Sequence, residues 1–141
     1  MAAQFTGQVV VVTGGAGAIG SAVARKFCDL GASAVIADID GDGAKRVAKA
    51  LGKKGLAVHA DVGRSADVDR LFAETLRAFG RLDVLVNNAG KSHGAHVLDF
   101  PEERWDDVMD VNLKSYFLCS QRAGRHWRET KRRGRIVNVG S

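Results

Sequence analysis

The sequence contains few cysteines and no long apolar run. Cys28 and Cys119 are the two cysteines among 141 residues, which is too few for a disulfide framework. Both lie in helical patterns, where a free cysteine is usually a small buried hydrophobic residue. No apolar run approaches the ~20 residues that a transmembrane helix requires, and residues 1–8 lack the basic and apolar regions of a secretion signal. These absences predict a soluble, cytoplasmic protein without a membrane partner.

What the sequence does contain is a regular apolar pattern. Hydrophobic residues make up 45% of the chain, enough for the core of one domain over residues 1–141. Short apolar runs alternate with segments whose apolar residues recur at helical spacing, and Ser65 is expected to cap the third helix. None of the runs alternates apolar with polar residues, which is typical of a parallel sheet covered on both faces. The expected strands are residues 9–12, 34–37, 56–60, 82–86 and 135–139, and the expected helices lie at residues 19–30, 44–51, 65–79 and from 101 onward.

The segment VVVVTGGAGAIGSAV, residues 9–23, places a glycine-rich turn between the first strand and the first helix. Such a turn lets backbone N–H groups approach a pyrophosphate at the positive end of the helix dipole. Two registers are possible for the glycines. Residues 15–20 spell G-x-G-x-x-G, a dinucleotide-binding fingerprint, whereas residues 13–20 fit T-G-x-x-x-G-x-G with Ala18 in place of the middle glycine.

Asp38 predicts which dinucleotide binds. It ends the second strand, at about the ~20-residue spacing at which an acidic residue binds the adenosine ribose. A carboxylate there repels the 2′-phosphate of NADP, and no Arg or Lys stands at residues 16–19 or at Ile39 to receive that phosphate. The alternative is an ordinary turn aspartate, as Asp40 and Asp42 are interpreted to be. The sequence therefore predicts NAD rather than NADP.

Further motifs carry a resemblance to a known family. They are DV at residues 61–62, NNAG at 87–90, DVNL at 110–113 and GRIVNVGS at 134–141. With the glycine turn, and in this order, they resemble the short-chain dehydrogenase/reductase family over the whole chain. The resemblance favours the register T-G-x-x-x-G-x-G for the turn, in which Ala18 replaces the middle glycine. Its Cβ adds bulk near the phosphates, and Gly17 beside it is expected to supply the lost freedom.

The resemblance implies a doubly wound α/β sheet of strand order 3-2-1-4-5 that ends, in this sequence, after strand five. It also implies NAD binding across the carboxyl ends of the strands, and hydride transfer between nicotinamide and a small alcohol or ketone by a homo-oligomer. The DV pair would meet the adenine, and NNAG would support the sheet centre and line the cleft. The residues expected to bind the cofactor are Gly14, Ala16, Gly17, Ile19, Gly20, Asp38, Ile39, Asp61, Val62, Asn88, Ala89 and Gly90.

The same resemblance implies two catalytic residues. Ser141 would hydrogen-bond the substrate oxygen, and Asn112 would hold a water of the proton relay. Asn112 stands within the apolar stretch 108–118, where a polar residue is informative. In the family the proton passes through a tyrosine paired with a lysine four residues later. Tyr116 is the one tyrosine here and Ser120 stands four residues after it, so Tyr116 is interpreted as a packing residue.

The missing tyrosine leaves two hypotheses. In the first, residues 1–141 are the dinucleotide-binding first part of a longer NAD-dependent dehydrogenase, and the last strand, IVNV, forms an exposed apolar edge in these residues alone. In the second, they form a nucleotide-binding fragment that lacks the Tyr-x-x-x-Lys pair and does not catalyse the reaction.

Two other features have competing interpretations. The basic segment at residues 122–135 could contact nucleic acid, an anionic substrate or an acidic carrier protein. Positive side chains are also favoured at a helix C-terminus, and we expect no nucleic-acid binding. His93 and His96 lie where open sheets bind ligands, so substrate contact and an incidental loop position both stay open. Without a third ligand at metal spacing, we expect no metal site.

Overall fold

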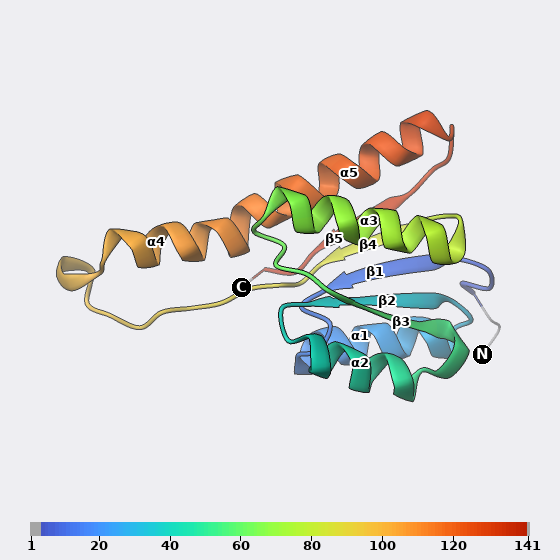
Figure 1. The fold of residues 1–141 in the computed structure, drawn as a ribbon, viewed down its shortest axis with the longest axis horizontal. Helices are drawn as coiled ribbons and strands as arrows, with labels where there is room; N and C mark the ends of the chain where they lie inside the picture. The colour runs from blue at the N-terminus through green and yellow to red at the C-terminus, as the bar shows by residue number, and fades with distance from the viewer. Residues whose placement is uncertain (1–3, 141) are drawn as a thin grey trace.

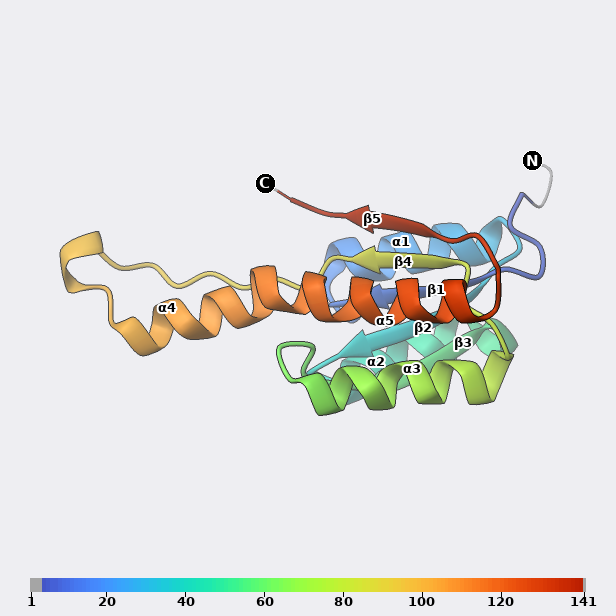
Figure 2. The same ribbon diagram turned by 90° about the horizontal axis from the view of Figure 1, so that it is seen from above.

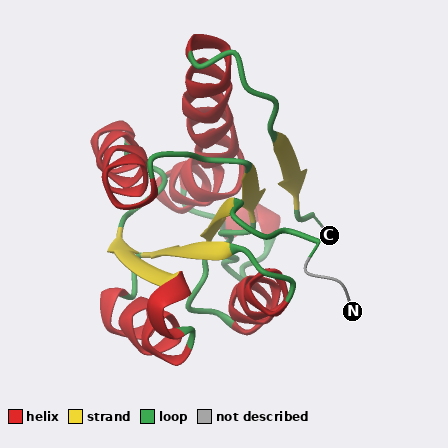
Figure 3. Cartoon of the chain, turned by 90° about the vertical axis from the view of Figure 1, so that its right-hand side faces the viewer, coloured by secondary structure: helices red, strands yellow, loops and turns green. Residues whose placement is uncertain are grey.

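The computed structural model describes residues 4–140 and shows a parallel five-stranded sheet with helices on both faces (Figures 1 and 3). The spatial order is β3-β2-β1-β4-β5, which confirms the predicted α/β fold and strand order. The strands are β1 (Val9–Thr13), β2 (Ser33–Asp38), β3 (Gly55–His59), β4 (Val84–Asn87) and β5 (Arg135–Asn138). The helices are α1 (Ala18–Asp29), α2 (Gly41–Ala50), α3 (Ser65–Phe79), α4 (Glu102–Met109) and α5 (Ser115–Glu129), with short 3₁₀ turns η1 (Gly52–Lys54) and η2 (Val97–Asp99) and a π-helical turn η3 (Asp110–Lys114).

The valines of β1 supply both cores of the domain. Successive side chains of a strand point to opposite faces. Val9 and Val11 therefore pack in the cluster that includes residues of α3 and α5, whereas Val10 and Val12 pack in the cluster with residues of α1 and α2. All four side chains are buried, because β1 lies at the centre of the sheet.

β5 differs from the central strands. It pairs with β4, yet all four of its residues are exposed, and the Ile136 and Val137 residues expose 41% and 47% of their surface. The expectation of an exposed apolar last strand is confirmed, and the expectation that every strand is covered on both faces is wrong for β5.

Several predicted boundaries are corrected by a few residues. β3 begins and ends one residue earlier than predicted, and β4 begins at Val84 rather than at residue 82. Asp83 immediately precedes β4, and its carboxylate accepts hydrogen bonds from the backbone N–H of Val9 and from the Arg81 guanidinium. Ser65 is the first residue of α3 rather than its cap, and its hydroxyl accepts a hydrogen bond from Arg122 of α5 instead.

The cysteines are both free and buried, as predicted. Burial raises the pKa of the Cys119 thiol to about 12, so this thiol stays protonated at neutral pH. Within residues 4–140, no helix is both long and apolar enough to cross a membrane.

Thr13 joins the carboxyl ends of β1 and β4. Its buried hydroxyl accepts hydrogen bonds from the backbone N–H groups of Asn88 and Ala89, each at 3.0 Å, and lies 3.4 Å from the carbonyl oxygen of Val86. The Asn87 side chain, also buried, donates to Ser120 of α5 and Asn138 of β5. These contacts fix the chain where it leaves the two central strands.

Replacing Thr13 by Val should lower the free energy of unfolding by about 1–3 kcal/mol, because two backbone N–H groups lose their acceptor while the side-chain shape is kept. Thr13→Ser retains the hydroxyl and should cost less than half as much. Urea denaturation of the three proteins measures the difference, and equal midpoints for the valine and serine variants would contradict this role of the hydroxyl.

Candidate functional site

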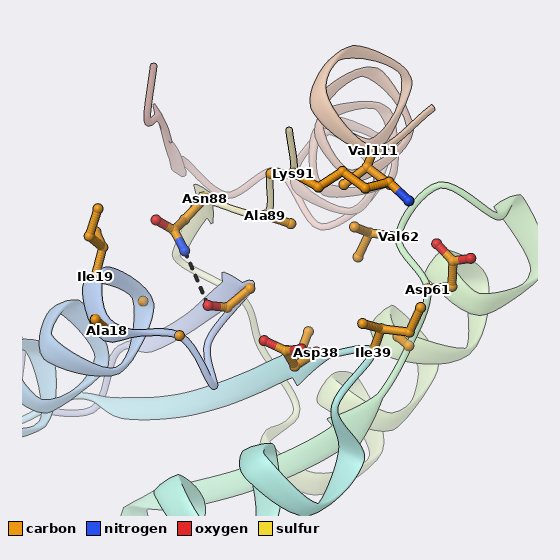
Figure 4. A pocket seen from close by; sticks show the side chains of 16 residues that line it. Ala18, Ile19, Asp38, Ile39, Asp61, Val62, Asn88, Ala89, Lys91 and Val111 are labelled. Carbon is orange, nitrogen blue, oxygen red and sulfur yellow. Dashed lines mark hydrogen bonds between the residues drawn. The ribbon is translucent and has the colours of Figure 1, made fainter. Parts of the chain in front are cut away.

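A cleft of about 440 Å³ opens at the carboxyl ends of the strands (Figure 4). Its walls come from the glycine turn and the start of α1, the end of β2, the segment after β3, the segment after β4, and η3. Ligands of doubly wound sheets bind at this edge, where the strand order reverses. The residues that line it are Gly14, Gly17, Ala18, Ile19, Gly20, Ala37, Asp38, Ile39, Ala60, Asp61, Val62, Asn88, Ala89, Gly90, Lys91 and Val111.

The glycine turn packs too closely for side chains at three of its positions, and a Cβ on Gly15 would lie 2.8 Å from the Ile36 side chain. Gly14 has a φ of +63°, and a Cβ there would lie 2.8 Å from the Cα of Ala89. A Cβ on Gly20 would collide with the carbonyl oxygen of Gly14. Gly17, in contrast, has a φ of −73° and room for a Cβ at 3.4 Å from the nearest atom. Gly14, Gly15 and Gly20 are therefore sterically required. The tight position at Gly14 and the room at Gly17 fit the register T-G-x-x-x-G-x-G better than G-x-G-x-x-G.

The expected compensation by Gly17 for Ala18 is wrong. The backbone of Gly17 is in an extended conformation that any residue adopts. Gly17 therefore does not use the conformational freedom of glycine to compensate for Ala18. Ala18 is instead the first residue of α1, and no side chain caps this helix. The first N–H groups of a helix have no partner within it, and here Gly17, Ala18, Ile19 and Gly20 present this end of α1 to the cleft.

Asp38 connects the end of β2 to the glycine turn. One carboxylate oxygen accepts a 2.9 Å hydrogen bond from the N–H of Ala16, and the other accepts one from the N–H of Asp40. Ala16 does not line the cleft, unlike the other predicted cofactor residues. Its N–H holds the carboxylate at the cleft wall, with further lone pairs on both oxygens.

Asp61 and Val62 form the wall beyond β3. The Asp61 carboxylate accepts from the N–H of Gly63, while its own N–H donates to Asp67 of α3. That bond, together with Arg70, lowers the pKa of the Asp67 carboxyl below its usual value. Asp61 and Val62 are thereby held just before α3 and line the same cleft as Asp38, with the Ile39 side chain between the two aspartates (Figure 4).

Asn88 closes the cleft on the β4 side. Its amide nitrogen donates to the carbonyl oxygens of Thr13 and Gly14, at 3.0 and 3.2 Å, and Figure 4 shows this side chain beside the glycine turn. Both donor hydrogens are therefore used on the turn itself, and the side-chain oxygen remains as an acceptor.

Asn112 lies outside the cleft, and its side chain binds the backbone of Lys91, the residue that follows NNAG. Its side-chain oxygen accepts from the N–H of Lys91 and its nitrogen donates to the Lys91 carbonyl, both at 2.8 Å. The apolar stretch around Asn112 suggests a buried polar group, but the residue is exposed. It lies in the π-helical turn η3, and such turns often occur at functional sites.

Lys91, His93 and Asp107 form a charged cluster at the rim. The Lys91 ammonium is 2.5 Å from one oxygen of Asp107, and the His93 ring lies 3.3 Å from the other. Hydrogen bonds from Lys91 and His93 hold the pKa of the Asp107 carboxyl below its usual value. His96 caps the short turn η2 through the N–H of Leu98. Among the described residues, no group of three or more His, Cys, Asp or Glu side chains is placed to hold a metal ion.

Several cleft residues were not predicted from the sequence. Ala37 and Ala60 line the cleft as the last small residues before Asp38 and Asp61, and Val111 reaches it from η3. Lys91 follows the NNAG motif directly and could have been included on that ground. Ser141 lies outside the described residues, so its predicted role stays a prediction.

The basic segment has partners within the fold. Arg122 binds Asp69 and Ser65 of α3, and Arg128 lies in the last turn of α5, as the helix dipole favours. Tyr116 packs as expected, and its hydroxyl also donates to the carbonyl oxygen of Val139, at 2.7 Å.

Comparison with known proteins shows the family. The family model for short chain dehydrogenase matches residues 8–141, and the chain belongs to this family. A crystal structure of 3-ketoacyl-(acyl-carrier-protein) reductase from Brucella melitensis complexed with NADH superposes with a TM-score of 0.93 at 35% identity, covering 97% of this chain and 58% of that one.

Two relatives illustrate the range of named activities. The subunit BbsD of (2S)-[(R)-hydroxy(phenyl)methyl]succinyl-CoA dehydrogenase from Thauera aromatica is 40% identical, over 95% of this chain and 55% of its own length. An NAD-dependent glycerol dehydrogenase from Listeria innocua is 37% identical, over 98% of this chain and 54% of its own length. The chain thus spans about half the length of the relatives it matches.

Alanine substitutions at Gly20 and Gly17 test the geometry of the turn. Gly20→Ala should lower the free energy of unfolding by about 1–3 kcal/mol, because the added methyl group meets the backbone of Gly14. Gly17→Ala should change it by less than about 0.5 kcal/mol, since its Cβ has room. Thermal denaturation followed by circular dichroism measures both, and the reverse order would contradict the packing of Gly14 against Gly20 in this turn.

Proposed function

We propose that the protein is an NAD-dependent oxidoreductase that transfers a hydride between the nicotinamide and a small alcohol or ketone. The observation that carries this proposal is the Asp38 carboxylate, held at the cleft wall beside a turn where Gly14 and Gly20 leave no room for a Cβ. Family membership supports the reaction class. A cytoplasmic location remains part of the proposal.

The glycine turn would bind the diphosphate of the cofactor. The uncapped N-terminus of α1 supplies N–H donors and the positive end of a helix dipole, and its first turn contains no acidic residue to oppose an anion. Gly14 and Gly20 permit a close approach between backbone and ligand that larger residues would block.

Asp38 would accept hydrogen bonds from the adenosine ribose hydroxyls. Each of its oxygens already accepts one backbone N–H, so the carboxylate is oriented before any ligand binds. The exposed Ile39 beside it offers no positive charge to a 2′-phosphate. Asp61 and Val62 would form the adenine side of the cleft, and Asn88, Ala89 and Gly90 would pack along the ribose and diphosphate.

At the reacting end, Asn112 and Ser141 would act on the substrate side. Once both Lys91 hydrogen bonds are made, the Asn112 amide retains one N–H and one lone pair, enough to hold a water molecule. Ser141 would hydrogen-bond the substrate oxygen, and the bound nicotinamide would supply or accept the hydride. The named activities of relatives leave the particular alcohol or ketone open.

We infer that the protein forms a homo-oligomer. Trp105 of α4, Leu113 of η3 and Phe117 at the start of α5 expose 58%, 60% and 60% of their surface, and α4 projects from the body of the protein (Figures 1 and 2). Apolar area of this kind is what association buries. Light scattering at several concentrations tests the inference, and a monomer throughout would contradict it.

A second candidate function is dinucleotide binding without catalysis. Two observations favour it: residues 1–141 contain no Tyr-x-x-x-Lys motif, and the hydroxyl of Tyr116 is bonded to the carbonyl oxygen of Val139, just after β5. An intact mass well above 15.0 kDa and alcohol-dependent NADH formation would support the dehydrogenase. A mass near 15.0 kDa with no turnover would support the binding fragment.

Asp38 should set the choice of cofactor. The parent protein should bind NADH more tightly than NADPH, and Asp38→Ala should narrow or reverse that order because the repulsion of the 2′-phosphate is lost. Asp42→Ala, on the exposed side of α2, should leave the ratio unchanged. Calorimetric titrations measure all six affinities, and equal binding of the two cofactors by the parent would refute the assignment.

A further inference from the structure

The cleft is lined by a single cationic side chain. Among its described residues, Asp38 and Asp61 are acidic and Lys91 alone is basic. A dinucleotide brings a doubly charged diphosphate, for which the glycine turn and the start of α1 provide N–H groups and a helix dipole but no cationic side chain. Figure 4 shows the Lys91 side chain extended along the upper edge of the cleft.

Lys91 also starts from a fixed point close to the glycine turn. Asn112 clamps its backbone N–H and carbonyl, and two residues earlier Ala89 packs against Gly14 so closely that a Cβ on Gly14 would meet the Ala89 Cα at 2.8 Å. Two residues span at most ~7 Å, so the backbone of Lys91 lies near the turn. The flexible four-carbon stem of the lysine lets the ammonium group move over the cleft.

The ammonium group is held at the rim by a partner outside the cleft. Asp107 of α4 binds it at 2.5 Å, and His93 contacts the other oxygen of the same carboxylate. Asp107 does not line the cleft, and its side chain is 44% exposed. Ion pairs in such exposed positions contribute little to stability, so a stronger anion can displace Asp107.

We propose that Lys91 is a cofactor-binding residue that transfers from Asp107 to the diphosphate when a dinucleotide enters the cleft. Asp107 then acts as a competing anion that holds the ammonium at the rim while the cleft is empty, and His93 stays beside Asp107 after the lysine leaves. The inference rests on the proposed dinucleotide binding and adds a residue to that site.

The two members of the ion pair should affect affinity in opposite directions. Lys91→Gln should weaken the binding of NADH and of ADP about five- to tenfold, the size of one charge-assisted contact near solvent, and should leave adenosine, which has no phosphate, unchanged. Lys91→Arg should restore most of the affinity. Asp107→Asn should tighten NADH binding about two- to threefold, because the lysine loses its competitor. Lys114→Gln is the matched control, since Lys114 pairs with Asp110 in a similarly exposed position and does not line the cleft.

Titrations of the purified protein, by calorimetry for NADH and ADP and by NMR for adenosine, give these affinities, and melting temperatures confirm that each variant folds. If the parent binds NADH but Lys91→Gln binds it equally well, this inference alone is overturned. If Asp107→Asn weakens NADH binding as Lys91→Gln does, the ion pair acts structurally and the transfer is refuted. A parent protein that binds neither NADH nor ADP overturns the proposed function as well.

Discussion

The cleft depends on the hydroxyl of Thr13, which holds the carboxyl ends of β1 and β4 together. Through it the backbone N–H groups of Asn88 and Ala89 are satisfied in a buried position, and the Asn88 side chain can reach back to the carbonyls of Thr13 and Gly14. The glycine turn and the NNAG segment are thereby packed closely against each other, with the Asn88 side chain bonded to the turn. If this junction loosened, both walls of the cleft would move.

The charges of the cleft are arranged around this junction. The N–H groups of Ala16 and Asp40 hold the Asp38 carboxylate in place. The uncapped N-terminus of α1 lines the same cleft. A ligand that offers hydroxyl donors at one place and a negative group at another matches this arrangement, and a nucleotide with a free ribose and a diphosphate is such a ligand.

The sequence predicted most of the fold and much of the cleft, for identifiable reasons. Buried parallel strands such as β1 are continuous apolar runs, so the local pattern was sufficient to predict them. The predicted ends of the first and third helices are each followed by a glycine with a positive φ angle, +102° at Gly31 and +68° at Gly80. The lining residues near Asp38, Asp61 and Asn88 lie at or just after strand ends. Because the strands are parallel, their carboxyl ends meet at one edge of the sheet. Their contact with a cofactor remains a prediction.

Other features depend on contacts between residues distant in sequence, which local patterns do not reveal. Ser65 resembles a helix cap, but its hydroxyl accepts a hydrogen bond from Arg122 on another helix. Asn112 looks buried within an apolar stretch, yet a π-helical turn places it outside, where it clamps Lys91. The role of Gly17 was overestimated because its backbone angles cannot be read from its neighbours.

The most direct test of the account is a crystal structure of the protein grown with NAD. The account predicts electron density for the diphosphate over the glycine turn and for the adenosine ribose within hydrogen-bonding distance of the Asp38 carboxylate. Density for the dinucleotide at another surface, or a ribose turned away from Asp38, would contradict it.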